Sequence, residues 1–168
     1  MLFGNNDNCS SYLKYCTGTP NSTGSPADLI ASGSLYPGHG NLTLSSQPVP
    51  NQPGIFFHGD NPAQIPFGNG FLCTTGGIVR GAVLFASANA AHYVYDNSDA
   101  QHGLGGFIGQ TRNFQYWYRD PMGGGAAFNL SNAITMTVQA NDECGDGGGG
   151  GGGGGGGFYG GPTDFAAH

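Results

Sequence analysis

Short runs in which apolar and polar residues alternate are the main pattern along this chain. The clearest is NAITMTVQA, residues 132–140, where one set of alternate positions is apolar and the other polar. Successive side chains of a strand point to opposite faces, so this pattern predicts a strand with one buried face. Apolar residues at helical spacing do not persist anywhere, because glycine or proline interrupts almost every window of ten residues. The apolar positions of the run are Ile134, Met136 and Val138, and the polar ones are Thr135, Thr137 and Gln139.

Short strands of this kind account for the pattern over the body of the chain. We expect them at 28–34, 42–46, 54–58, 70–73, 78–85, 91–95, 113–119 and 133–139. Turn-rich pieces such as YPGHGN and HGDNPAQIPFGNG lie between them. This spacing predicts an all-β fold, an antiparallel β-sandwich or jelly roll of about eight short strands. The domain would occupy residues 1–144, beginning with a short cysteine-containing segment, and a glycine-rich tail would follow at 145–168.

Two of these strands carry more specific expectations. GIFFHG, at 54–59, is a continuous apolar run of the sort that lies between two layers, so we expect a central strand there. In the strand at 78–85, we expect the face formed by Val79, Val83 and Phe85 to point inward.

The stretch NFQYWYRDP, at 113–121, holds the single tryptophan of the chain and supports two interpretations. In one, it is a central strand covered on both faces, and Arg119 pairs either with Asp120, in a salt bridge that closes the following turn, or with a loop carbonyl. In the other, the face formed by Gln115, Trp117 and Arg119 is an exposed platform that stacks on sugar rings and hydrogen-bonds to them.

The composition narrows the partners and the location. Charged residues make up 8% of the chain, and the formal net charge is −6. Binding a phosphate backbone takes clustered cations, so we expect no nucleic-acid partner, and an anionic membrane surface is equally disfavoured. No run of 18 apolar residues occurs, so we expect no membrane insertion. A polar, nearly uncharged surface is typical of secreted or assembled proteins, which predicts an extracellular or cell-surface location. The fixed cations are Lys14, Arg80, Arg112 and Arg119.

The four cysteines, Cys9, Cys16, Cys73 and Cys144, are spread along the chain without a CxxC motif. Zinc sites need closely spaced ligand pairs, so disulfides are the favoured use, with free buried thiols as the alternative. Four cysteines allow three pairings, and the sequence does not choose among them. Glycosylation sequons at Asn8, Asn21, Asn41 and Asn129 agree with an exported chain.

Residues for chemistry are few, and we expect no enzymatic activity and no cofactor. Neither a GxSxG nor an HExxH motif occurs. His58 and Asp60 form an H-x-D pair at a strand end that could share a cation, although a solvated or hydrogen-bonded histidine is the simpler interpretation. The loop YDNSDAQ offers Asp96, Asn97 and Asp99 as oxygen ligands for calcium but lacks the spacing of an EF-hand.

The tail has a different composition from the body of the chain. Eleven consecutive glycines, 147–157, precede FYGGPTDFAAH. A glycine run is commonly a linker, but it also suits an extended strand packed closely against another backbone. Phe158, Tyr159 and Phe165 would then be contacts for a neighbouring subunit.

Four motifs, CTGTPNSTG, PGIFFHGDN, QIPFGNGFLC and NFQYWYRDP…FNLSNAITMTV, lie in this order between residues 16 and 138. Together they resemble a secreted bacterial β-rich module that often stands at the C-terminal end of extracellular proteins. The resemblance implies an extracellular location and a β-sandwich, but no catalytic residue, substrate or cofactor. The early cysteine pair and the cysteine after FGNGF match it, whereas Cys144 and the glycine-rich tail depart from it.

Two functions follow as expectations. The first is a secreted structural protein that assembles with copies of itself into an extracellular filament or surface layer, the tail docking on the next subunit. The second is a carbohydrate- or surface-binding module that works through the aromatic platform around Trp117.

Overall fold

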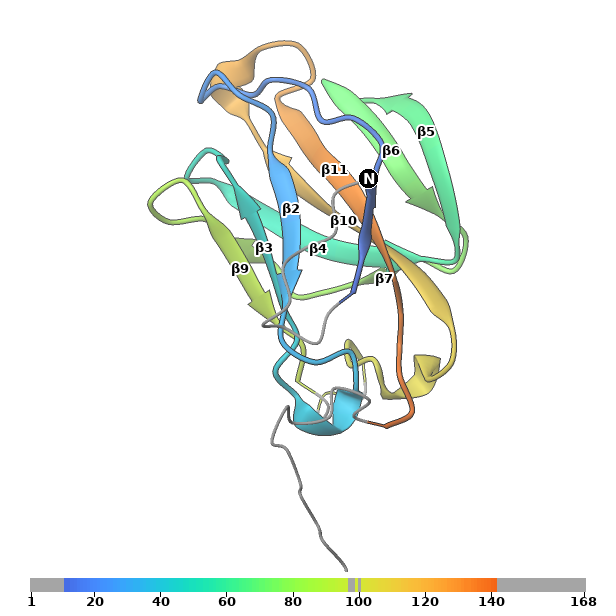
Figure 1. The fold of residues 1–168 in the computed structure, drawn as a ribbon. Coiled ribbons are helices and arrows are strands. Elements are labelled where there is room, and N and C mark those ends of the chain that lie inside the picture. The colour runs from blue at the N-terminus through green and yellow to red at the C-terminus, as the bar shows by residue number, and fades with distance from the viewer. Residues whose placement is uncertain (1–10, 97–98, 100, 142–168) are drawn as a thin grey trace, which may run out of the picture.

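The structure, a computed structural model, describes residues 11–96, 99 and 101–141. These residues form eleven strands and three single-turn 3-10 helices, and no α-helix occurs among them (Figure 1). All strand pairs are antiparallel. The prediction of an all-β, antiparallel fold is therefore confirmed for the part of the chain that the structure describes. The 3-10 turns are η1 (Pro37–His39), η2 (Gly105–Phe107) and η3 (Pro121–Gly123).

The large sheet has six strands in the order β1-β11-β10-β4-β7, and β8 pairs with the other end of β4. Its two central strands, β10 and β4, are the aromatic strand and the GIFFHG strand, so both expectations of a central position are confirmed. The bounds are β1 (Leu13–Tyr15), β4 (Pro53–Gly59), β7 (Val79–Arg80), β8 (Leu84–Phe85), β10 (Thr111–Arg119) and β11 (Phe128–Thr137).

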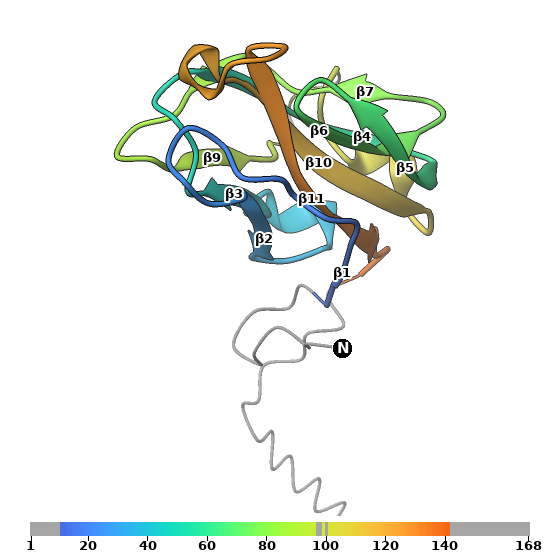
Figure 2. The ribbon, with the colours of Figure 1, turned by 90° about the horizontal axis from the view of Figure 1, so that it is seen from above.

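A small sheet of three strands, in the order β2-β3-β9, packs on one face of the large sheet (Figures 1 and 2). Buried apolar side chains from both sheets form one core. At its centre, the ring of Phe56 stacks on Tyr116 of the large sheet, 4.3 Å between centroids, and lies 6.1 Å from Tyr93 of the small sheet. The strands are β2 (Asp28–Ser32), β3 (Thr43–Gln47) and β9 (Ala91–Val94).

The remaining two strands, β5 (Asn61–Phe67) and β6 (Gly70–Thr75), pair only with each other. Figure 2 shows this hairpin on the side of the large sheet that faces away from the small sheet. The sequence prediction missed β5, because Pro62 and Pro66 made the segment read as a turn. Proline is tolerated in β5 because the strand lies at an exposed edge, where a missing N–H breaks no pairing.

The predicted strand at 78–85 is wrong in two respects: it is interrupted after Arg80, and two of the three residues expected to point inward, Val83 and Phe85, are exposed, whereas Val79 is half-buried. Arg80 pairs with Phe57 and Leu84 with Gly54, so three residues, 81–83, lie opposite only two on β4. The extra residue is a bulge, which reverses the alternation of side chains. Val83 and Phe85 are therefore 63% and 74% exposed.

The alternation predicted for residues 134–138 is confirmed, since Ile134, Met136 and Val138 are all buried in the core. The strand begins earlier than predicted, at Phe128. A register shift lies between these two parts, because Trp117 pairs with Leu130 whereas Gln115 pairs with Ala133. Leu130 consequently points to the hairpin side of the sheet, although it stands an even number of residues before Ile134.

A disulfide joins Cys16, just after β1, to Cys73 in β6, which confirms the use of these two cysteines. The Cα atoms are 6.1 Å apart, and the bridge spans 57 residues of sequence. It ties the hairpin to the N-terminal edge of the large sheet. Cys9 and Cys144 lie outside the described residues.

Candidate functional site: an apolar groove beneath the hairpin

The turn of the hairpin, Phe67-Gly68-Asn69-Gly70, is fastened to the loop between β10 and β11. Gly68 has a φ of +61° and lies against the ring of Phe128, so that a Cβ at this position would be 2.1 Å from the ring. Asn69 donates its backbone N–H to the carbonyl of Phe128 and its side-chain amide N–H to that of Gly124. Its side-chain oxygen accepts the N–H of Ala126 at 2.9 Å. One end of the hairpin is therefore fixed in place.

Gln115 of β10 fastens the middle of the hairpin. Its side chain is fully buried. The amide oxygen accepts the backbone N–H of Cys73, and the amide nitrogen donates to the carbonyls of Phe71 and Ser131, all at 2.8 Å. All three partners are backbone groups, two of them in buried contacts and one in a partly buried contact, and buried backbone groups need such partners.

Replacing Gln115 by leucine is expected to lower the free energy of unfolding by about 2 kcal/mol, because two buried backbone groups and one partly buried one lose a hydrogen bond. Urea denaturation followed by circular dichroism measures the change. Gln110→Leu, at an exposed position, is the matched control and should change stability by less than about 0.5 kcal/mol. Equal losses in the two variants would contradict the role assigned to Gln115.

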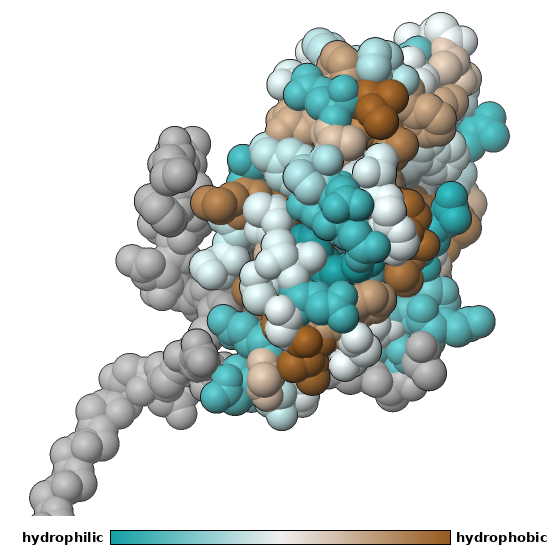
Figure 3. Space-filling model, turned by 90° about the vertical axis from the view of Figure 1, so that its right-hand side faces the viewer, coloured by the Kyte–Doolittle hydropathy of each residue, from teal (hydrophilic) through white to brown (hydrophobic). Residues whose placement is uncertain are grey.

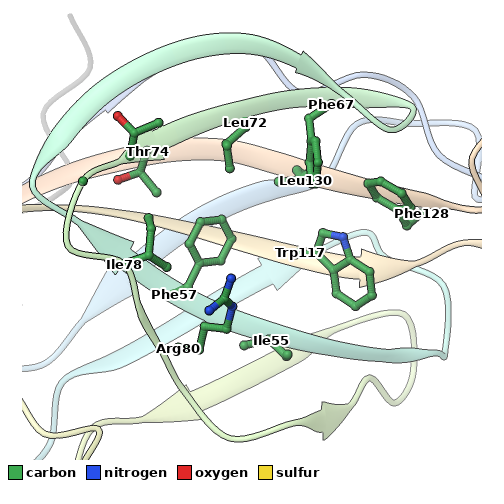
Figure 4. A pocket seen from close by; sticks show the side chains of 12 residues that line it. Ile55, Phe57, Phe67, Leu72, Thr74, Ile78, Arg80, Trp117, Phe128 and Leu130 are labelled. Atoms are coloured by element: carbon green, nitrogen blue, oxygen red, sulfur yellow. The ribbon is translucent and has the colours of Figure 1, made fainter.

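Between these attachments the hairpin and the large sheet enclose a groove with a volume of about 520 Å³ (Figure 4). Volumes of this size are typical of ligand-binding sites. Phe67 and Leu72 of the hairpin lie on one side, and Phe57 and Trp117 of the sheet lie on the other. The attachments fix the position of the hairpin relative to the large sheet and so set the width of the groove. Its lining consists of Ile55, Phe57, Phe67, Leu72, Thr74, Thr75, Gly76, Ile78, Arg80, Trp117, Phe128 and Leu130.

Aromatic rings form one end of the groove. The ring of Phe128 lies 5.2 Å from that of Phe67 and 5.6 Å from that of Trp117, both pairs being tilted. Phe67 is 44% exposed, and Trp117 is partly exposed. Arg80 is the one charged residue of the lining. The site therefore suits an apolar or aromatic group and offers a single positive charge to a neighbouring anion.

The structure separates the three residues of the predicted platform. Trp117 lines the groove, but Gln115 is buried with its amide used by the backbone, and Arg119 is exposed at the end of β10. The expected salt bridge between Arg119 and Asp120 is wrong. Asp120 is fully buried and accepts the backbone N–H of Ser22 at 2.9 Å.

The space between His58 and Asp60, where the sequence left room for a cation, is occupied by the guanidinium of Arg112. Arg112 is 1% exposed; it donates from Nε to His58 Nδ1 at 2.9 Å, forms an ion pair with Asp60 and donates to the carbonyl of Gly77. Its guanidinium also lies over the ring of Phe107, 4.3 Å from the centroid. Burial and the nearby Arg112 lower the pKa of His58 to about 3. This cluster is a structural contact between β4 and β10.

Part of the loop proposed for calcium is described. One oxygen of the Asp99 side chain accepts the backbone N–H groups of Gln101 and His102, and the other contacts His102 Nδ1 at 2.6 Å. Asn97 lies outside the described residues. No group of three or more histidine, cysteine, aspartate or glutamate side chains that could hold a metal occurs among the residues described.

The asparagines of two sequons use their side-chain amides in internal hydrogen bonds. Asn21 and Asn129 are buried, and their amide nitrogens donate to Tyr118 and Pro48, and to Thr19 and Pro20, respectively. Asn41 is exposed. Asn8 lies outside the described residues, as do the predicted assembly contacts Phe158, Tyr159 and Phe165.

Sequence reasoning found Trp117 but missed the opposite wall of the groove, Phe67 and Leu72. A signal was present, since Ala63, Ile65 and Phe67 alternate within NPAQIPF, but the two prolines hid it. No described segment is a helix of the length and apolarity that crossing a bilayer requires. No protein-family model, curated protein or solved structure matches this chain.

Proposed function

We propose that this protein is a secreted structural subunit that assembles with copies of itself into an extracellular filament or surface layer, with the tail of one subunit docked on the next. The apolar groove carries the proposal. It is hollow and lined with aromatic and aliphatic side chains, and an exposed apolar concavity on a soluble domain is typical of an interaction site. A neighbouring chain that filled it would bury that apolar area.

The charge and the disulfide support this assignment. A chain with 8% charged residues is weakly self-repelling, which favours close packing of identical copies. The Cys16–Cys73 bridge suits an oxidising compartment outside the cytoplasm. Figure 3, which looks at the hairpin side, shows hydrophobic residues in separate patches among hydrophilic ones. We also propose that the fold is an antiparallel β-sandwich or jelly roll, the sandwich being what the resemblance to the secreted bacterial module implies.

A contact between a tail and a groove joins two different surfaces of the same subunit. Such a head-to-tail contact leaves one free tail and one free groove at the two ends of every oligomer, so it propagates into filaments unless a ring closes. A homodimer built on one self-complementary patch would stop at two subunits.

A chain that ends after Asp146, and so keeps Cys144, is expected to remain monomeric under conditions in which the full chain forms filaments or layers. Electron micrographs of the two preparations at equal concentration test this. The truncated chain should melt within a few degrees of the full chain if its body is intact. Unchanged assembly without residues 147–168 would overturn the proposal.

The second candidate is glycan binding in the same groove, favoured by the partly exposed indole of Trp117 and by Arg80, which both line it. Sugars need several hydrogen-bonding side chains, and the amide of Gln115 is already used by the backbone. The groove therefore supports an apolar occupant better. Glycan binding that disappears in Trp117→Ala, with the fold retained, would favour this second function.

A further inference from the structure

The groove sets three requirements on whatever fills it. Its lining is aromatic and aliphatic, so the occupant must present apolar side chains. The floor and the hairpin are fastened to each other at Gln115 and Asn69, so the occupant must enter a groove of fixed width. The charge of Arg80 at the groove favours an acidic group next to the apolar ones.

The end of the glycine-rich tail meets these requirements. The sequence FYGGPTDF, 158–165, contains three aromatic residues and one acidic residue, Asp164, directly before Phe165. Asp164 is the single carboxylate side chain between residues 147 and 168, and the same segment contains no lysine or arginine. The spacing of aromatic and acidic groups therefore matches an aromatic groove with one cation.

The distance that the tail must cover favours a second copy over the same chain. The aromatic end of the groove lies at the Phe128 end of β11, whereas the tail follows the Thr137 end (Figure 1). The ten residues of β11 separate these ends by about 30 Å at the rise of a strand. Sixteen residues, 142–157, lie between Asn141 and Phe158. A glycine-rich chain of that length has a root-mean-square span of roughly 20–25 Å and a maximum of about 55 Å.

Reaching the aromatic end of its own groove would therefore stretch the tail beyond its average span, along the full length of the strand. A neighbour whose groove lay beside the Thr137 end of β11 would be within that span, and the glycines carry no side chains that would restrict the approach. We infer that the aromatic end of the tail, residues 158–165, of one copy fills the groove beneath the hairpin of a second copy. This inference rests on the proposed function and names the surface through which it acts.

Trp117 reports on the groove directly, because it is the single tryptophan of the chain and lines the site. The test compares acrylamide quenching of Trp117 in the full chain and in the full chain carrying Phe158→Ser, Tyr159→Ser and Phe165→Ser. A filled groove buries most of what it contacts, so the quenching constant should roughly double in the triple variant. A synthetic peptide of residues 157–168 should restore protection, whereas the same peptide with the three serines should not.

A second pair of variants probes the groove wall without touching the tail. Phe67→Asp places a charge in the groove and should remove both the protection of Trp117 and assembly. Phe85→Asp, at a phenylalanine that is exposed on β8 and does not line the groove, is the matched control and should change neither.

The outcomes separate the inference from the proposed function. Protection that appears only as the full chain assembles supports both. Protection that persists in monomers at high dilution would show that the tail fills its own groove, which overturns docking between copies. Assembly with equal quenching in the full chain and the triple variant would overturn the inference and leave the proposed function in place. Equal quenching without assembly would overturn both.

Discussion

Replacing Cys16 and Cys73 together by alanine is expected to lower the free energy of unfolding by about 4 kcal/mol. The bridge closes a loop of 57 residues, and the chain entropy that it removes from the unfolded state grows with the logarithm of loop length. Chemical denaturation of the oxidised protein and the double variant measures the difference. A change below about 1 kcal/mol would contradict this account of the bridge.

The same substitution is expected to loosen the groove. Cys73 forms the disulfide with Cys16. Its backbone carbonyl accepts a hydrogen bond from the hydroxyl of Tyr15 at 2.8 Å, and its backbone N–H donates to the side chain of Gln115, so β6 is joined at this residue to two strands of the large sheet. Burial raises the pKa of Tyr15 to about 12, which keeps this hydroxyl protonated as a donor up to strongly alkaline pH. Greater quenching of Trp117 in the double variant, at temperatures where it is still folded, would show that the hairpin has shifted.

Acidification is expected to destabilise the protein between about pH 6.5 and pH 3. The contribution of His58 by itself lowers the free energy of unfolding by about 3 kcal/mol at pH 4. The pKa of His58 in the folded protein is lowered to about 3 by burial and by Arg112, whereas in the unfolded chain it is near 6.5. Below pH 6.5 the unfolded state therefore binds a proton that the folded state does not bind. Stability is fully retained above this range and is lost as the pH falls through it.

His58→Gln is the matched variant for this prediction, because glutamine keeps an oxygen that accepts a hydrogen bond from Arg112 but does not titrate. Urea midpoints at pH 7, 5.5 and 4 give the slope for both proteins. The carboxylates contribute equally to the slopes of both proteins, so the difference between the slopes isolates the contribution of His58. Parallel slopes would show that His58 is protonated without penalty in the folded state.

The pattern of apolar residues predicted the strands well where no bulge interrupts them. The segment 134–138 is found as expected, because alternation in a strand depends only on which face is covered. The two central strands are found because large apolar side chains on both faces indicate a strand between two layers. The prediction for residues 78–85 was wrong because one extra residue opposite β4 reverses the alternation of side chains. Nothing in the sequence of this segment marks the bulge.

The groove could be predicted only in part. Trp117 stands out by its side chain, but its partners come from β5, β6 and β11, which are brought together by pairings far apart in the sequence. The amide of Gln115 can hydrogen-bond equally well to a sugar or to a backbone group. It bonds to the backbone because it lies beneath the hairpin, a position that the sequence alone does not reveal. His58 is hydrogen-bonded, as the simpler interpretation held, but its partner, Arg112, comes from a distant strand that the H-x-D spacing does not reveal.

The central claim, that a tail of one copy enters the groove of another, is tested most directly by mixing two incomplete chains. The chain ending after Asp146 has a groove but no glycine-rich tail, and the full chain with Phe67→Asp has a tail but a blocked groove. Each alone should sediment as a monomer, and an equimolar mixture should sediment as a 1:1 dimer that grows no further. A mixture that sediments as two monomers, while the unaltered chain assembles, would contradict the claim.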